Sequence, residues 1–278
     1  MKKLVWISSY PKSGNTWIRF FLSNYFYNKK KQNSNFDILK KIDKFPLQKY
    51  LQKYVSKDDL KNAYNISKYW SLVQKNMTAN DEKFIFIKNH NALVSIEGNN
   101  LTEAKYCLAF IYLVRDPRDV AVSYSNFDKK LNIDEAIERI TSKNLYCHSS
   151  KKNPYDIEIL GSWKFNFFSW KNGIIDVPRI FIRYEDLVKN TFQTKLKIIK
   201  FLSQVLGSSV DEEHIKFSID QSNFNRLNEL EKKNKFHESS GNFFNSGKIG
   251  QWKNILSKQQ IDKIENFCRD EMKELNYL

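Results

Sequence analysis

Short apolar runs alternate with longer stretches of helical periodicity along this chain. Four of the runs predict buried parallel strands: Lys3–Ser8, Phe84–Lys88, Cys107–Val114 and Arg179–Tyr184. Apolar residues at helical spacing predict helices over Thr16–Tyr27, Asp58–Gln74, Arg118–Phe127, Ile133–Ser142, Ile157–Lys171, Glu185–Leu202 and Lys258–Leu275, the last capped by Ser257. Because strands followed by helices are typical of βαβ units, the pattern predicts an α/β fold with a central parallel sheet.

The polar segments between these runs predict how the chain is organised. A length of 278 residues with no separating linker favours a single domain over residues 1–278. Residues 28–80, rich in Lys, Asn and Gln up to residue 56, are expected to form a helical insertion or cap. Residues 234–250 are expected to form a flexible loop.

The amino-acid composition limits the classes of ligand and partner that we expect the protein to bind. The 46 basic and 31 acidic residues leave a net charge of +15, which favours anionic ligands. The lysines are dispersed and therefore indicate a solvated surface, so a nucleic-acid or heparin-binding module is the weaker alternative. No apolar run is long enough to cross a bilayer, and the apolar stretch after Met1 is too short for a signal peptide. The three cysteines are widely spaced and match neither a zinc site nor a disulfide framework. We therefore expect a cytoplasmic, metal-free protein.

The segment SSYPKSGNTW, residues 8–17, carries the clearest chemistry. It joins a predicted strand to a predicted helix, and such a turn presents backbone N–H groups to a phosphate. Lys12 adds a cation, and Gly14 allows close approach. The Walker A pattern is not met, because Ser9 stands at its first glycine and Asn15 at its lysine. An ordinary strand-to-helix turn with an exposed lysine remains the alternative.

Further polar residues follow the other predicted strands. Lys88 and His90 end the second strand, Arg115 follows the third, and Tyr184 ends the fourth. Ligands of open α/β sheets bind beyond the carboxyl ends of the strands, so these residues are expected to converge. Arg115 is suited to bidentate phosphate binding, although it could instead form a structural ion pair with Asp116.

Five motifs in order resemble the sulfotransferases that use 3′-phosphoadenosine 5′-phosphosulfate (PAPS). They are YPKSGNTW (10–17), LVRDPRDVAVSY (113–124), GSWKFNFFSW (161–170), RYEDLVKN (183–190) and GKIGQWKN (247–254). The resemblance implies a three-layer fold like that of P-loop NTPases. It also implies a small-molecule or glycan acceptor and no role for nucleic acid or metal.

The resemblance assigns donor-binding roles residue by residue. The residues expected at the 5′-phosphosulfate are Lys12, Ser13, Gly14, Asn15 and Thr16. Those expected at the 3′-phosphate are Arg115 and Ser123. Those expected at the adenine are Trp17, Tyr184, Ser222 and Phe224, although Trp17 and Phe224 could equally be core residues.

The motif Lys88-Asn-His90 matches the family's K-x-H signature, in which the histidine is the catalytic base. His90 is accordingly expected to take the acceptor's proton during in-line sulfuryl transfer. Lys12 would neutralise charge on the leaving phosphate, and Lys88 would place the sulfuryl group. These three are the predicted catalytic residues, and 3′,5′-bisphosphoadenosine (PAP) is the expected product.

Two departures from the family pattern leave alternatives open. The family's Arg-Lys pair is replaced by Asn245 and Ser246, so that only Gly247 remains, with Lys248 as a substitute cation. An inactive nucleotide-binding relative and a P-loop small-molecule kinase or NTPase are therefore the alternative functions. The family's dimer motif survives only in degenerate form, which leaves a homodimer as an open expectation. The acceptor is expected to be shaped by residues 28–80, the loop after His90, and residues 143–160 and 234–246.

Overall fold

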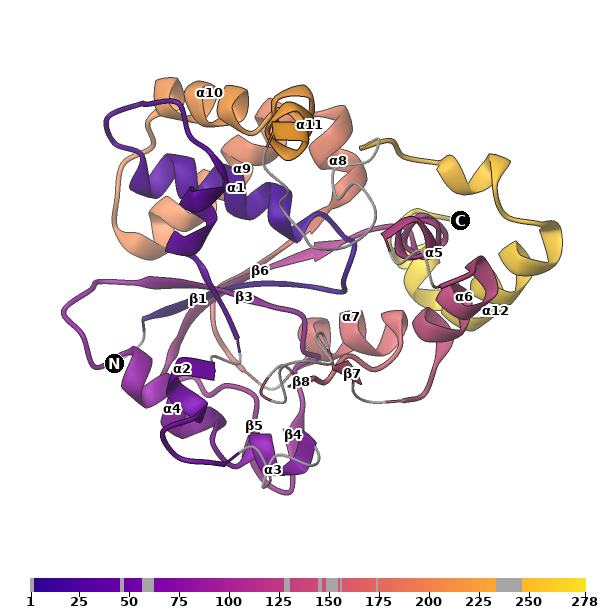
Figure 1. The fold of residues 1–278 in the computed structure, drawn as a ribbon, viewed down its shortest axis with the longest axis horizontal. Coiled ribbons are helices and arrows are strands. Elements are labelled where there is room, and N and C mark those ends of the chain that lie inside the picture. Colours follow the sequence, from indigo (N-terminus) through magenta and orange to yellow (C-terminus); the bar gives the residue numbers. More distant parts are fainter. Residues whose placement is uncertain are drawn as a thin grey trace. The chain divides into compact units, whose positions relative to one another are not determined.

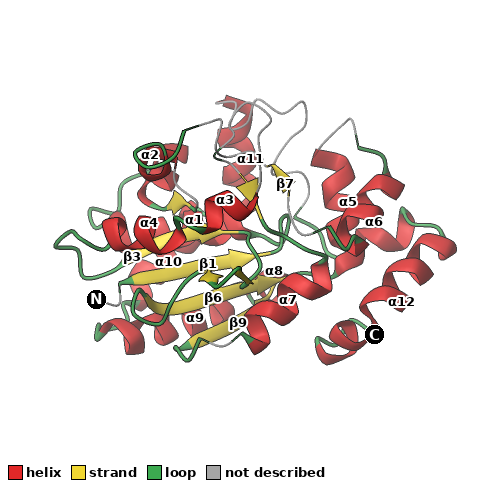
Figure 2. Cartoon of the chain, turned by 90° about the horizontal axis from the view of Figure 1, so that it is seen from below, coloured by secondary structure: helices red, strands yellow, loops and turns green. Residues whose placement is uncertain are grey.

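The central element of the computed structural model is a five-stranded sheet with the order β2-β3-β1-β6-β9. The structure describes residues 3–45, 48–56, 63–127, 131–144, 147–148, 155, 157–173, 175–233 and 247–278. The strands of this sheet are β1 (Leu4–Ser9), β2 (Asp43–Lys44), β3 (Ile85–Asn89), β6 (Cys107–Val114) and β9 (Arg179–Arg183). Figure 2 shows them in yellow, side by side. The fold is thus α/β with a central parallel sheet flanked by helices, as predicted from the sequence.

The pairing of β1 with β3 sets the register at the functional end of the sheet. The two strands are parallel, with Leu4 opposite Ile85 and Ser8 opposite Asn89. Both therefore end together, and the residues that follow them leave the sheet at the same edge. All six residues of β1 are buried, as expected for a strand covered on both faces.

The chain divides into two compact units, each with its own interior. Unit 1 comprises residues 1–10, 42–112 and 143–181, and unit 2 comprises residues 11–41, 113–142 and 182–278. Among its described residues, unit 1 holds most of the sheet and four helices: α2 (Gln48–Leu51), α3 (Ala63–Ser67), α4 (Trp70–Met77) and α7 (Trp163–Asn172). It also holds two short antiparallel pairs, β4 (Ser95–Ile96) with β5 (Asn99–Asn100), and β7 (Cys147–His148) with β8 (Ile157–Glu158).

Aromatic packing joins α7 to the sheet inside unit 1. The ring of Trp170 lies 4.9 Å from that of Phe110 on β6 and 6.4 Å from that of Trp6 on β1. Trp170 and Trp6 are completely buried. Large rings in edge-to-face contact stabilise the interface of helix and sheet through area and geometry together.

Unit 2 is helical. It contains the 3₁₀ helices η1 (Phe36–Lys41) and η3 (Gln251–Asn254) and the helices α1 (Asn15–Tyr27), α5 (Pro117–Phe127), α6 (Ile133–Thr141), α8 (Tyr184–Lys189), α9 (Thr191–Leu206), α10 (Glu212–Gln221), α11 (Phe224–Lys233) and α12 (Lys258–Glu274) (Figure 1). Ser257 caps α12 in a capping box with Gln260, as the sequence predicts. Asn132 and Glu135 form the same arrangement at α6.

Several predicted helices differ from those observed. Residues 157–158 form β8, and α7 begins only at Trp163, because Gly161 has a φ of 63° and Ser162 caps the helix. The expected helix 185–202 is interrupted at Asn190, whose φ of −128° is not helical. Within the expected helix 58–74, residues 63–67 and 70–77 form two helices, and residues 57–62 lie outside the described part.

Other elements have no counterpart in the sequence-based prediction. Helices α10 and α11 were not expected, although Asp211 caps α10 and two glutamates follow it in the first turn. The segment 28–80 contributes helices and also β2, which joins the sheet by pairing with β3. Of the expected loop 234–250, residues 234–246 lie outside the described part. None of the described helices is long and apolar enough to cross a membrane.

Candidate active site

The turn between β1 and α1 has the geometry of an anion-binding site. Gly14 stands at the N-cap of α1 with a φ of 92°, and no side chain caps the helix. No acidic residue lies in the first turn. The first N–H groups of the helix therefore point into the turn, at the positive end of the helix dipole. Both the N–H groups and the dipole favour a phosphate or sulfate bound there.

Two features of this turn test whether a phosphate group fits there. A Cβ added at Gly14 would lie 2.7 Å from Cδ2 of Tyr184, so only glycine lets this ring lie against the turn. Within the described part of the chain, the completely buried Oγ of Ser13 has no hydrogen-bond partner. A buried hydroxyl left unpaired is costly, and a phosphate oxygen would satisfy it. The turn therefore fits the anionic end of a nucleotide.

Lys12 adds a cation whose protonation state depends on its surroundings. Its Nζ lies 3.7 Å from the centroid of the Phe127 ring. Burial, and secondarily the nearby charge of Arg115, lower the pKa of Lys12 to about 7, while Glu231 opposes the shift. A bound phosphate would favour the protonated form, so anion binding and protonation of Lys12 support each other.

Arg115 connects the turn to the C-terminal loop of unit 2. Its guanidinium donates to the carbonyl oxygens of Lys12 (3.2 Å) and Lys248 (3.1 Å) and lies 4.4 Å from the centroid of the Tyr184 ring. Asp116, the alternative ion-pair partner of Arg115, pairs with Arg118 at 2.7 Å. Arg115 therefore lies beside Lys12 and Lys248, as the donor-site hypothesis requires.

Three aromatic side chains form one wall beside these cations. The ring centroid of Trp17 lies 5.9 Å from that of Tyr184 and 5.6 Å from that of Phe224. The Tyr184 hydroxyl donates to the carbonyl oxygen of Gly247 (3.1 Å). A Cβ at Gly247 would lie 2.8 Å from Cζ of Phe224, so this glycine permits the loop to touch the wall. Residues distant in the sequence thus meet in unit 2 as predicted.

Other predicted donor residues occupy more peripheral or internal places. The Ser222 carbonyl accepts from Nε1 of Trp17 (2.7 Å), whereas its buried hydroxyl donates to the Ser218 carbonyl (2.7 Å). Ser123 is half-buried on α5, two turns into the helix, and Asn15 and Thr16 begin α1. Asn245 and Ser246 lie outside the described residues.

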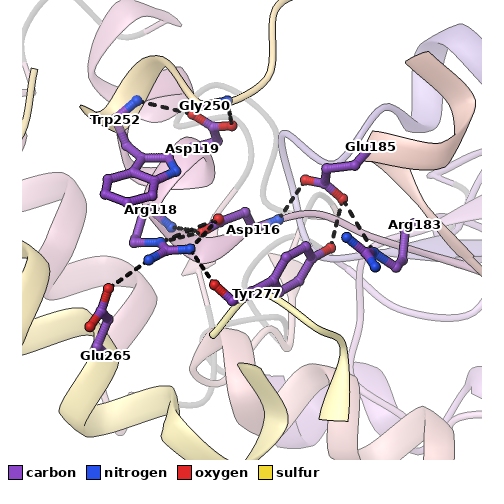
Figure 3. A network of polar contacts seen from close by, with 9 residues as sticks. All are labelled: Asp116, Arg118, Asp119, Arg183, Glu185, Gly250, Trp252, Glu265 and Tyr277. Atoms are coloured by element: carbon purple, nitrogen blue, oxygen red, sulfur yellow. Dashed lines mark hydrogen bonds and ion pairs between the residues drawn. The ribbon is translucent and has the colours of Figure 1, made fainter. Parts of the chain in front are cut away.

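A polar network holds the loop of residues 247–254 in place (Figure 3). The carboxylate of Asp119 accepts from the backbone N–H groups of Gly250 (2.6 Å) and Trp252 (3.2 Å). The guanidinium of Arg118 lies 3.8 Å from the Trp252 ring centroid and pairs with Glu265 of α12 at 2.6 Å. Asp119 and Arg118 were not singled out as site residues, although both lie in the motif LVRDPRDVAVSY.

The same network reaches the C-terminal residues and α8. Tyr277 accepts from Arg118 at its carbonyl oxygen (2.8 Å) and donates its hydroxyl to Glu185 (2.8 Å) (Figure 3). Glu185 also accepts from the backbone N–H of Asp116 (3.0 Å). Burial raises the pKa of Glu185, and these hydrogen bonds oppose that shift. Burial also raises the pKa of Asp116, and its contacts with Arg118 oppose that shift. The residues flanking Arg115 and Tyr184 are therefore joined by charge-assisted contacts.

His90 lies in unit 1, directly after β3. Its Nδ1 is 2.8 Å from the carbonyl oxygen of Ser9 and 3.1 Å from the Ser9 hydroxyl. A carbonyl oxygen can only accept, so in the neutral ring Nδ1 carries the hydrogen and Nε2 carries the lone pair. The end of β1 thus selects the tautomer of His90 whose Nε2 can accept a proton.

Buried amides hold the backbone around His90. Nδ2 of Asn166 on α7 donates to the His90 carbonyl oxygen (3.0 Å), and Oδ1 of Asn166 accepts from the Tyr112 hydroxyl (2.8 Å). The carbonyl oxygen of Asn91 accepts from Nε1 of Trp170 (2.8 Å). Asn166 was not singled out from the sequence, although it lies within the motif GSWKFNFFSW, and its amide is buried in the structure.

Lys88 makes an ion pair in this structure. Its Nζ lies 3.4 Å from Oε1 of the buried Glu158, and Nζ of Lys44 lies 3.7 Å from the same oxygen. Glu158 belongs to β8, an element that sequence reasoning missed. The ammonium of Lys88 is thus held by a carboxylate inside unit 1.

Comparison with known proteins places this geometry in a family. Residues 2–276 match the model of the sulfotransferase domain. The chain belongs to that family. An amine sulfotransferase of Oryctolagus cuniculus is 26% identical over 285 residues, spanning 97% of this chain and 81% of the relative. A flavonol 3-sulfotransferase of Flaveria bidentis is 26% identical over 287 residues, spanning 96% and 81%.

Two solved structures have a fold similar to that of this chain. Retinol dehydratase in complex with androsterone and inactive cofactor PAP superposes with a TM-score of 0.62 at 18% identity, over 98% of this chain and 81% of that one. Mouse sulfotransferase SULT7A1 complexed with PAP gives a TM-score of 0.62 at 18% identity, over 100% and 86%. The predicted family and sulfuryl-transfer activity are therefore confirmed, and the sulfotransferase is an enzyme of the transferase class. The kinase alternative is not favoured.

Proposed function

We propose that this sulfotransferase moves a sulfuryl group from PAPS to a hydroxyl or amine of a small molecule. The observation that carries the proposal is the meeting, within unit 2, of the Lys12 turn, Arg115 and the aromatic wall of Trp17, Tyr184 and Phe224. This arrangement supplies two separate cationic groups and one aromatic surface, which matches a nucleotide with two anionic ends. The names of the amine and flavonol sulfotransferases support a small organic acceptor.

The proposed donor-binding residues follow the sequence-based prediction. The turn and the first residues of α1 hold the 5′-phosphosulfate through Lys12, Ser13, Gly14, Asn15 and Thr16. The 3′-phosphate is held by Arg115 and Ser123, with Gly247 and Lys248 from the C-terminal loop. The orphaned Ser13 hydroxyl and the uncapped N-terminus of α1 support the first set. The contact between Arg115 and the Lys248 backbone supports the second.

His90 is the proposed base. Nε2 takes the acceptor's proton while the acceptor oxygen or nitrogen forms its bond to sulfur and the bond from sulfur to the bridging phosphate oxygen breaks. The hydrogen bond from Nδ1 to the Ser9 carbonyl supports this role, because it orients the ring and keeps the lone pair on Nε2. Positioning and charge stabilisation then supply most of the remaining rate enhancement, as in phosphoryl transfer.

Two lysines act on the transferring group. Lys12 neutralises charge that develops on the leaving phosphate, and its lowered pKa means that the bound anion itself completes its protonation. Lys88 leaves Glu158 to place the sulfuryl group, and Lys44 then remains as the cation at that carboxylate. With Asn245 and Ser246 in place of a basic pair, we expect weaker donor binding than two further cations would allow.

A binding and transfer experiment tests this function. Calorimetry should show that PAP binds the purified chain far more tightly than ATP with Mg²⁺. A panel of phenols, amines, sugars and lipids incubated with labelled PAPS should then yield at least one sulfated product. Preferential binding of Mg²⁺–ATP would instead support the kinase alternative, and tight PAP binding with no transfer to any acceptor would support an inactive relative.

A further inference from the structure

One buried lysine in unit 2 takes no part in the proposed chemistry. Lys195 lies on α9, on the same helical face as Ile198, Ile199 and Leu202. All four side chains have 0% exposure. A lysine among such residues is costly to bury, because its ammonium loses water. Within the part of the chain that the structure describes, no carboxylate pairs with it. The chain thus keeps a buried lysine where an apolar residue would be less costly.

The contacts of Lys195 include the aromatic wall. Its Nζ donates to Oγ of Ser222 (3.0 Å), the residue that ends α10. It also lies 4.8 Å from the ring centroid of Trp17 and 4.8 Å from that of Phe21, both on α1. Trp17 in turn donates from Nε1 to the carbonyl oxygen of Ser222 (2.7 Å). Lys195, Ser222 and Trp17 therefore form a closed triangle of contacts.

We propose that Lys195 is a positioning residue for nucleotide binding, which fixes the Trp17 ring and the Ser222 turn that precedes Phe224. The inference rests on the proposed donor site. The indole is restrained in two directions, in its plane by the hydrogen bond to Ser222 and across its face by the ammonium. Since Phe224 follows Ser222 by two residues and touches Trp17, the same anchor sets both rings of the wall.

Two observations support a functional role for this anchor. Burial lowers the pKa of Lys195 to about 7, so protonating this amine inside unit 2 carries a desolvation cost. The groups that face it from α1 and α10 are the rings of Trp17 and Phe21 and the Ser222 hydroxyl, none of which carries charge. A group retained in spite of such a cost is commonly one whose exact contacts serve a site.

The test compares matched substitutions on one helix. Lys195→Met keeps the length and apolar stem but removes the ammonium, while Lys197→Met removes the charge of an exposed lysine two residues away. We expect PAP dissociation constants, measured by calorimetry, to rise about 5- to 10-fold for Lys195→Met and to stay unchanged for Lys197→Met. The Lys195→Met loss should persist at high salt, which screens long-range charge effects. Its melting temperature at pH 7 should not fall, because a buried unpaired charge is gone.

A second variant removes the partner of Lys195 in the same hydrogen bond. Ser222→Ala removes the acceptor and leaves the lysine, so it should weaken PAP binding to a similar extent, and the double variant should lose no more than either alone. Wild-type affinity in a folded Lys195→Met protein, or an equal loss in Lys197→Met, would overturn the proposal. If Lys195→Met does not fold, unchanged affinity in Ser222→Ala overturns it. Failure of the wild-type protein to bind PAP contradicts the donor site itself and is recognised as such.

Discussion

The proposed donor-binding region of unit 2 and the His90 region of unit 1 are organised by different kinds of interaction. Around Arg115, guanidinium and ammonium groups meet backbone carbonyls and aromatic rings. Around His90, neutral groups predominate: the Ser9 carbonyl orients the ring, and the Asn166 amide holds the backbone. The first region suits a highly charged ligand, whereas the second holds one imidazole ring in a fixed orientation.

This difference explains which residues of the two regions can be identified from the sequence. Cations, glycines and aromatics around a phosphate form recognisable motifs, because ligand geometry dictates their types. Amides that support a catalytic ring have no such signature, because many buried asparagines satisfy only local backbone groups. Perturbing each region should therefore separate binding from turnover.

The largest effect is expected at His90. His90→Ala should lower kcat for sulfuryl transfer by about a thousandfold, because proton transfer from the acceptor loses its base. The dissociation constant for PAP should change less than about twofold, which calorimetry on the same preparation would show. A variant that keeps most of the wild-type kcat would show that another group acts as base.

Arg115 should give the opposite pattern. Arg115→Met should raise the dissociation constant for PAP by about 10- to 100-fold, since a charged contact is lost together with the anchors to Lys12 and Lys248. Arg179→Met, at the exposed first residue of β9, is the matched control. Equal PAP affinities in the two variants would remove the proposed 3′-phosphate site.

Asn166 should affect turnover with little effect on binding. Asn166→Ala removes the donor to the His90 carbonyl, so the loop after β3 loses an anchor and kcat should fall about tenfold at unchanged PAP affinity. Asn172→Ala, at the last residue of the same helix, is the comparison for a general effect on α7. A fall in PAP affinity equal to the fall in kcat would argue against a role specific to His90.

The smallest effect concerns stability and pH at Lys195. Its folded pKa of about 7 lies below the usual 10.5, so between these pH values the unfolded chain binds more protons than the folded one. Stability from this group therefore increases as pH rises above 7. Between pH 7 and 9, the free energy of unfolding of the wild type should rise relative to Lys195→Met by on the order of 2 kcal/mol. Urea titrations at both pH values measure this difference, and parallel values for the two proteins would contradict the lowered pKa of Lys195.

Two departures from the predicted helices have the same cause. The short strand β8 and the break at Asn190 lie where local periodicity still suited a longer helix, as residues 157–171 and 185–202 show. Pairing of Ile157–Glu158 with Cys147–His148 overrides that local preference, because inter-strand hydrogen bonds form only in the folded chain. Helix α10 had a usable signal in Asp211 and the two glutamates that follow.

The sequence by itself determined the α/β fold, the four main strands and the sulfotransferase family, and it supplied the residues of the proposed donor site. These properties reside in local periodicity and in motifs whose residue types are dictated by a bound anion. Only the tertiary structure decided that Asp119 holds the loop of Gly250, that Asn166 supports His90, and that Lys195 is buried beneath Trp17. Each of these contacts joins residues more than 70 positions apart, and such pairs acquire their meaning only when folding removes both partners from water.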